Sequence, residues 1–264
     1  MTLTATILGC GSSGGVPRIG GPNGAGQWGA CDPTNPRNRR RRCSLLVQQG
    51  EASVLVDTSP DLREQLLSAR VGHLDAVVMT HPHADQTNGI DDLRVLSQVM
   101  QRRVDMHADG ATLAHLMKQF GYCFKTPEGS EYPPILNGHV ISEPFSEFHV
   151  KLIPVRPFWM RHGRIRSLGY RFGKLAYCSD VDALDDEAFA VLEGVECWIV
   201  DALRYREHPS HAHLDLTLSW IARIKPARAI LTNLHTDLDY ETLRREIPEG
   251  VEPAYDGMVV TIAD

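Results

Sequence analysis

The chain has 264 residues, 42% of them apolar, and its 27 basic and 33 acidic side chains give a formal net charge of −6. This length can bury a substantial core, and we expect a single domain over residues 1–264. The charge balance argues against general affinity for nucleic acid, and the lack of any 18-residue apolar run argues against a membrane span. The six cysteines form no Cys-x-x-Cys pair, which disfavours both a disulfide framework and a cysteine-type zinc knuckle. Since the first eight residues also lack the basic leader of a signal peptide, we expect a reduced, cytoplasmic location.

Apolar runs, turn residues and helical periodicity predict a chain that mixes strands and helices throughout, without repeats or a linker. Strands are predicted at 3–8, 44–48, 53–57, 75–79, 104–107, 148–155, 167–172, 174–178, 197–201, 229–232 and 258–262. Helices are predicted at 60–69, 89–99, 109–121, 185–192, 215–224 and 240–246. Polar residues follow the apolar runs of several strands, namely Asp57, Asp180, Asp201 and Asn233. Because a rigid sheet fixes the loops beside its strand ends, we expect function there.

A cluster of metal-capable residues follows the apolar run 76–79. It reads Thr80-His81-Pro82-His83-Ala84-Asp85, so His81 and His83 lie two residues apart. In an extended segment such residues project to the same side, where they could share one ion with Asp85 close by. Two surface histidines beside a helix-capping aspartate would explain either histidine alone, but the whole cluster favours a metal site.

Five arginines occur within residues 37–42, after a loop rich in glycine and proline that spans 9–36. One interpretation is a solvated face or a flexible arm. The other is an anion site, because guanidinium groups grip phosphate oxygens in pairs. The run leads directly into the strand 44–48, which would hold some of the side chains of Arg39, Arg40, Arg41 and Arg42 near the fold. Both interpretations stay open.

These features together resemble the metallo-β-lactamase superfamily. The resemblance rests on residues 80–85, on the glycine-rich segment 9–17, on residues 177–180 and on the order of the strands. It implies an α/β fold, an αββα sandwich with a metal centre at the edge between its two sheets. Softer features at 89–94 and 167–170 make the chain most similar to the cyclic-phosphate phosphodiesterases of bacterial phosphonate breakdown.

Transferred residue by residue, the resemblance implies a first metal site of His81, His83 and His162, with Asp180 bridging toward a second ion. His162 alone, among arginines, would suggest an ordinary surface residue, and Asp180 alone would suggest a turn or helix cap. Their positions in the order of the family's motifs give them these roles. A divalent ion, Zn or Mn, is the expected cofactor.

The second site departs from the family pattern at two positions. Relatives carry histidine directly after the motif's aspartate and again after the strand that ends here at Thr232, but this chain has Gln86 and Asn233. An amide oxygen is a weaker ligand than imidazole for zinc-like ions, so we expect one firmly bound ion and a weak or absent second one. His235 lies two residues beyond Asn233 and could compensate.

Three more histidines precede the predicted helix 215–224. The resemblance implies that a histidine here protonates the leaving group; His213 fits best and His211 is the reserve, although either could cap the helix or bind substrate. Some relatives hold a structural zinc with clustered cysteines near the start. This early loop has only Cys31, so no structural zinc is predicted.

The resulting hypothesis is a metal-dependent phosphodiesterase acting on a small cyclic phosphate or nucleotide-like substrate. Asp85 would orient or deprotonate the attacking water, His213 would protonate the departing oxygen, and the arginines would hold a phosphate. Alternatives are a thioester or lactone hydrolase on the same scaffold, or a ligand-binding protein with a degraded second metal site. A small phosphate-containing partner is expected, with no membrane; nucleic acid is disfavoured, and a homodimer is left open.

Overall fold

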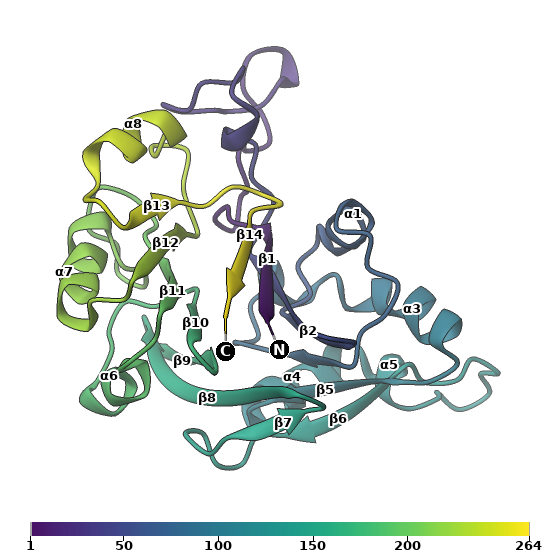
Figure 1. Cartoon of the computed structure of the whole chain (residues 1–264). Helices are drawn as coiled ribbons and strands as arrows, with labels where there is room; N and C mark the ends of the chain where they lie inside the picture. Colours follow the sequence, from purple (N-terminus) through teal and green to yellow (C-terminus); the bar gives the residue numbers. More distant parts are fainter. Residues whose placement is uncertain (1, 264) are drawn as a thin grey trace.

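The computed structural model describes residues 2–263 and confirms the α/β sandwich: two seven-stranded sheets face each other, with helices on their outer faces (Figure 1). The first sheet has the order β14 (Val259–Ile262), β1 (Leu3–Gly9), β2 (Ser44–Gln49), β3 (Ala52–Val56), β4 (Ala76–Val78), β5 (Val104–Ala108) and β6 (Leu136–Val140). The second has the order β13 (Val251–Pro253), β12 (Arg228–Thr232), β11 (Cys197–Asp201), β10 (Leu175–Cys178), β9 (Ile165–Phe172), β8 (Ile153–His162) and β7 (Phe148–Val150).

Each sheet combines an antiparallel and a parallel half. Strands β3 to β6 run parallel in the first sheet, and β10 to β13 run parallel in the second. The carboxyl ends of parallel strands meet at one edge, so the loops after β3, β4, β10, β11 and β12 gather there. This arrangement brings the predicted strand-end residues toward one place.

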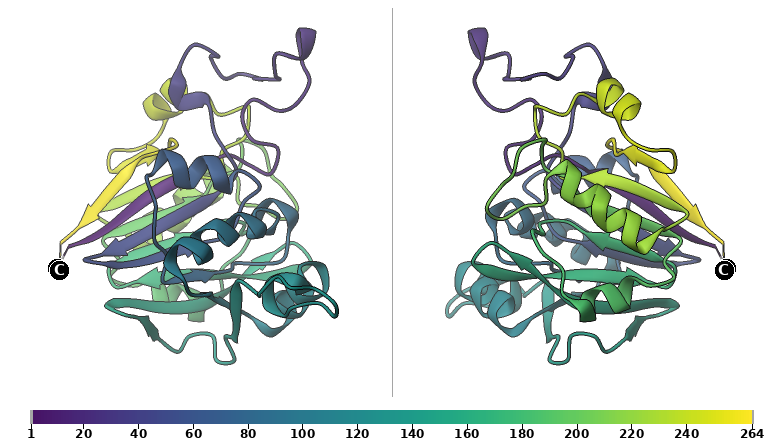
Figure 2. Two further views of the ribbon diagram at one scale, coloured as in Figure 1. Left: turned by 90° about the vertical axis from the view of Figure 1, so that its right-hand side faces the viewer. Right: turned by 90° about the vertical axis from the view of Figure 1, so that its left-hand side faces the viewer.

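The two sheets are covered on both faces. Helices α1 (Leu62–Ser68), α3 (Leu93–Met100), α4 (Gly110–Gln119) and α5 (Gly121–Phe124) pack on the first sheet, and α6 (Asp186–Leu192), α7 (Leu214–Ile224) and α8 (Tyr240–Glu246) accompany the second (Figures 1 and 2). Strand β2 shows the consequence: Leu45 and Val47 enter the core between the sheets, while Leu46 enters the core beneath the helices. A strand buried on both faces reads as a continuous apolar run, which is why these strands were predictable.

A long connection between β1 and β2 projects from the sandwich (Figure 2). It contains two short 3₁₀ turns, Pro22–Gly24 and Pro36–Asn38, and its exposed tip is fastened by backbone pairing of Arg18 with Gln27. Ile19 near the tip is 97% exposed. The arginine run predicted to hold phosphate forms the returning limb of this connection.

The structure differs from the predicted elements in several places. The single strand 148–155 is a hairpin of β7 and β8, because Lys151 adopts a left-handed backbone (φ 51°) that turns the chain inside the run. Strands β6 and β13 were not predicted; β6 lies at a sheet edge with mostly exposed side chains, so it lacks the apolar signal.

Among residues 2–263, no helix combines the length and the apolar character needed to cross a bilayer.

Candidate metal centre

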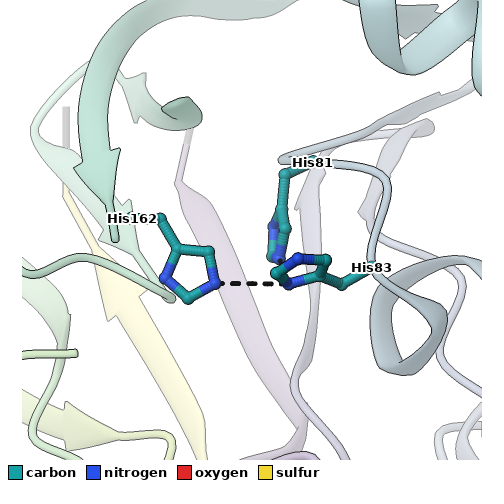
Figure 3. Close-up of side chains that lie close together, drawn as sticks. All are labelled: His81, His83 and His162. Atoms are coloured by element: carbon teal, nitrogen blue, oxygen red, sulfur yellow. Dashed lines mark hydrogen bonds between the residues drawn. The ribbon is translucent and has the colours of Figure 1, made fainter. Parts of the chain in front are cut away.

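Three histidines from two elements converge at the edge between the sheets. His81 and His83 lie in the loop after β4, and His162 ends β8 (Figure 3). His81 Nε2 is 2.9 Å from His83 Nδ1, which is 3.2 Å from His162 Nε2. The three ligating nitrogens thus lie within 4.8 Å of one another, as donors to a single ion do.

The protonation chemistry of these rings fits a metal. Burial, followed by the neighbouring His162 and His83, holds the pKa of His81 well below its usual range. Burial and His162 also lower the pKa of His83. Metal ions bind neutral imidazole, so the lowered pKa values of His81 and His83 favour the form that a divalent ion takes up.

The orientation of the His81 ring is fixed by a chain of hydrogen bonds through Thr80 to Asp57. Asp57, fully buried after β3, accepts the Thr80 N–H and the Thr80 hydroxyl, each at 2.8 Å. The hydroxyl oxygen lies 2.9 Å from His81 Nδ1 and, having given its proton to Asp57, accepts the ring N–H. Burial raises the pKa of Asp57 well above its usual value despite these bonds. The chain therefore leaves His81 Nε2 for a ligand, as carboxylate-supported metal histidines do.

His162 is fixed in the same sense by a backbone carbonyl. Its Nδ1 lies 2.6 Å from the Ser210 carbonyl oxygen, which can only accept, so Nδ1 carries the proton and Nε2 faces the cluster. Gly163, next along the chain, has φ 60°, and a Cβ there would approach the Ser210 Cβ to 2.8 Å. The glycine therefore permits the close approach that makes this bond.

A second group of ligand-capable atoms adjoins the first, consisting of His162, Asp180 and His211 within 4.8 Å of one another. Asp180 follows β10 and is almost completely buried. His211 Nδ1 lies 2.9 Å from Asp201 Oδ2 and 3.9 Å from Asp180 Oδ1. Burial alone would lower the pKa of His211, but the charge and hydrogen bond of Asp201 outweigh it and raise the pKa to about 9.

Amides occupy the two positions where the family resemblance led us to expect histidines. Gln86 Nε2 donates to Asp85 Oδ2 at 3.1 Å and to Asp180 Oδ2 at 3.2 Å, and Gln86 Oε1 is buried without a partner among the described residues. The Asn233 amide nitrogen is 3.2 Å from His211 Nδ1. Burial, followed by the charge of Asp180, raises the pKa of Asp85. One amide thus links the two carboxylates that a second ion would otherwise share.

Three strand ends around this centre adopt a left-handed backbone without glycine. The φ angles are 62° at Asp57, 51° at Asp180 and 61° at Asn233. Short polar side chains tolerate this region better than other residues do. The turn at each strand end is what places these side chains at the centre.

The remaining predicted histidines are placed elsewhere. His235 Nδ1 contacts the Asp237 carboxylate and lies 3.3 Å from the Thr236 hydroxyl, outside both ligand-capable groups found among residues 2–263. Burial, together with the positive charge of Arg18, lowers its pKa to about 4. His213 is half-buried at the N-cap of α7, where its carbonyl accepts the Thr217 N–H at 3.1 Å. The histidine that lies beside Asp180 is His211, the second candidate for the proton donor.

Arg40 fastens the projecting connection to the body. Its side chain is 2% exposed and donates to the carbonyls of Leu238 at 2.7 Å and His235 at 3.3 Å, and to Asn38 Oδ1 at 3.2 Å. The two carbonyl acceptors lie just after Asn233 in the chain. Arg40 therefore supports the segment that carries Asn233.

The other three arginines also have protein partners. Arg41 pairs with Asp256 at 3.0 Å, and Arg42 pairs with Asp61 at 2.8 Å. Arg39 is exposed and lies over the Trp28 ring at 5.1 Å. Of the four predicted anion ligands, Arg39 is thus the one whose guanidinium is solvent-facing and without an ion pair among the described residues.

Sequence reasoning missed two members of this centre's support. Asp57 and Asp201 were recognised only as polar residues at strand ends, and neither was assigned a partner. No pattern links Asp57 with Thr80, or Asp201 with His211, because these contacts join segments that the fold brings together. The strand-end position of both aspartates was the available signal.

With this geometry, comparison with known families identifies the class. Residues 52–233 match the family model described as the beta-lactamase superfamily domain, and the chain belongs to this family. Within this superfamily of hydrolases, the chain resembles the PhnP family in particular. A solved structure described as a new diphosphatase from that family is 32% identical, covers 99% of this chain and 98% of its own, and has a TM-score of 0.89.

Two further proteins extend the comparison. Zinc-bound PqqB from Methylobacterium extorquens, at 17% identity and a TM-score of 0.76, covers 97% of this chain and 99% of its own; it shows a shared fold. A curated protein named octanoyltransferase, from Porphyromonas gingivalis, is 32% identical over 98% of this chain. This chain spans about half (52%) of that protein's length.

Proposed function

We propose that the protein is a metal-dependent phosphodiesterase that hydrolyses a small cyclic phosphate or a nucleotide-like substrate. The observation that carries the proposal is the group of three converging imidazoles, His81, His83 and His162, flanked by Asp180 and by His211. The likeness to a PhnP-family diphosphatase across nearly the whole chain favours a phosphorus–oxygen bond as the bond that breaks. A small phosphate-containing molecule, rather than nucleic acid, is the proposed partner.

The proposed cofactor is one divalent ion, Zn or Mn, held by the three histidines and Asp180. Such an ion supplies Lewis-acid chemistry, activating water and neutralising charge on the phosphoryl oxygens. Asp85 is the proposed acceptor of the water's proton, because its burial favours the protonated carboxyl. Gln86 bonds both Asp85 and Asp180, so a second ion would have to displace these hydrogen bonds.

The proposed proton donor to the leaving oxygen is His211 rather than His213. Asp201 holds His211 through Nδ1, and the His211 ring lies 4.7 Å from the His162 ring, centroid to centroid. Nε2 is then the ring nitrogen left for a substrate. His213 lies at the start of α7, where its backbone serves the helix.

Kinetics on a panel of phosphodiesters, thioesters and lactones, with metal content measured on the same samples, tests the proposal. We expect phosphodiesters to be preferred. His211→Ala should lower turnover about 100-fold for a substrate with a poor leaving group and much less for a nitrophenyl ester, which leaves without a proton. His213→Ala is the matched control and should change neither rate. Equal losses on both esters would exclude His211 as the proton donor.

A second candidate is acyl chemistry. The octanoyltransferase name of the curated relative is the observation in its favour, and a thioester hydrolase would be its form on this scaffold. Faster hydrolysis of thioesters than of phosphodiesters in the same panel would select it. Ligand retention without any metal-dependent turnover would select a binding protein. The proposed location is the cytoplasm, which suits six buried free thiols.

A further inference from the structure

A cavity of about 410 Å³ lies outside the candidate metal centre, at the start of β4. Its lining includes Asp75, Arg102, His139 and Lys151 and none of the residues assigned to the metal centre. Ala76 also lines it, and at about 3.3 Å per residue of extended chain the path to His81 is on the order of 15 Å. A neighbouring cavity of about 480 Å³ shares His107 and His139 with it. Such volumes suit a small organic ligand.

One half of this cavity is rich in cationic donors. Asp75 Oδ1, on a side chain that is 5% exposed, lies 2.7 Å from Lys151 Nζ, 2.9 Å from Arg102 Nη2 and 2.9 Å from His73 Nε2. Arg102 Nη2 also donates to the Leu74 carbonyl at 3.0 Å, which fixes the guanidinium. Around Asp75 two permanent cations meet one carboxylate, so this half of the cavity carries a local excess of one positive charge, while Asp105 lies in the other half. An arginine fork suits phosphate.

Lys151 is held in place by its turn. It carries the left-handed backbone of the hairpin between β7 and β8, with φ 51°, a conformation that costs a lysine about 1 kcal/mol. Non-glycine residues in this region concentrate at ligand clamps and active sites. The hairpin thus directs this side chain toward Asp75.

The other half of the cavity ends in a stack of flat rings. Phe148 stacks on His107 with centroids 4.8 Å apart, and His107 stacks on His139 at 4.8 Å, with interplanar angles of 24° and 20°. Asp105, the second carboxylate in the lining, orients His139 by accepting from Nε2 at 3.0 Å. The His139 side chain is 46% exposed, so a further aromatic ring can extend the stack.

We propose that this cavity binds a nucleoside monophosphate, with its base on the His139 ring and its phosphate between Arg102 and Lys151. Two independent features lie on the walls of one cavity: a local excess of positive charge around Asp75, and a ring stack whose last member, His139, is partly exposed. The inference does not depend on the proposed function of the metal centre.

Calorimetric titration of the metal-loaded protein with AMP, adenosine and inorganic phosphate tests this site. We expect AMP to bind at least 10-fold more tightly than either fragment, because only AMP uses both halves. Lys151→Met and His139→Ala should each weaken AMP binding at least 10-fold while metal content stays constant. Lys174→Met is the matched control, since this lysine pairs with Glu196 at 2.8 Å and is similarly exposed (45%).

The His83→Ala variant distinguishes AMP binding at the metal centre from AMP binding in the proposed cavity. The proposed site predicts that AMP binding survives this substitution. The proposal fails if no AMP binds, if binding disappears in His83→Ala, or if Lys151→Met and His139→Ala bind AMP as the unmodified protein does. Phosphate binding as tight as AMP binding, unaffected by His139→Ala, would overturn the nucleotide assignment and leave an anion site alone.

Discussion

The two halves of the candidate metal centre are built from different donors. In the imidazole half, formed by His81, His83 and His162, the outward nitrogens of His81 and His162 are engaged by Thr80 and Ser210, so Nε2 of each faces the cluster. In the amide half, formed by Gln86 and Asn233, the Gln86 amide nitrogen donates to Asp85 and Asp180, and the Asn233 amide lies against His211. The imidazole half thus presents ring nitrogens to an ion, whereas the Gln86 amide nitrogen of the other half is already bonded to Asp85 and Asp180.

Removing a ring from the imidazole half should have the largest effect. His81→Ala leaves two imidazoles, so we expect the bound metal to be largely lost and activity to fall at least about 100-fold. The fold should persist because it rests on the sheets rather than on the ion. Elemental analysis and thermal unfolding check both points, with the exposed His149→Ala as control. Full metal content in folded His81→Ala protein would contradict the ligand assignment.

Disturbing the support of the imidazole half should have a smaller effect. Asp57→Asn keeps the shape but can no longer accept from both the Thr80 amide and hydroxyl in the same way, which releases His81 from its fixed orientation. Loss of such a supporting contact weakens metal binding about 10- to 100-fold. A chelator competition titration measures this. An unchanged affinity would show that the loop alone orients the ring.

The amide half can be converted toward the imidazole half. Gln86→His combined with Asn233→His should raise the metal content from about one toward two per chain, and should increase phosphodiesterase activity several-fold if two ions share the transition-state charge. Gln86→His alone serves as the intermediate control. Two tightly held ions already present in the unmodified protein would refute the one-ion prediction, and His211 would then be the first ligand to test.

The smallest expected effect on the centre comes from loosening the segment behind Asn233. Arg40→Ala removes three hydrogen bonds from a buried guanidinium, and we expect a loss of about 3 kcal/mol in the free energy of unfolding. Hydrogen exchange should quicken in residues 234–238, whereas metal content should stay constant. Arg39→Ala is the control and should be neutral for stability. A loss of metal in Arg40→Ala would mean that the two halves are not independent.

Part of the candidate centre was readable from the sequence because His81, His83 and Asp85 lie within one short segment. His81 and His83 follow a buried strand two residues apart, a spacing that favours a shared ion, and Cys197–Asp201 and Tyr240–Glu246 were predicted with their observed bounds. Burial on both faces of the sheets made the apolar runs unambiguous.

The parts that escaped prediction depend on contacts between distant segments. His213 was preferred to His211 as the proton donor because only the fold shows that Asp201 lies beside His211. Arg40 was interpreted as a phosphate ligand because the sequence does not reveal the carbonyls of a segment nearly 200 residues later. A run of like charges carries no information on which members are buried.

The left-handed backbone at Asp57, Asp180 and Asn233 has a consequence for engineering. Glycine at each of these positions would relieve about 1 kcal/mol of backbone strain. At Asp57, however, glycine would also leave the buried Thr80 N–H and hydroxyl without an acceptor, which costs about 1–3 kcal/mol for each unpaired group. The backbone alone therefore favours glycine at these turns, whereas the side-chain contacts and the proposed metal chemistry require the acid or the amide.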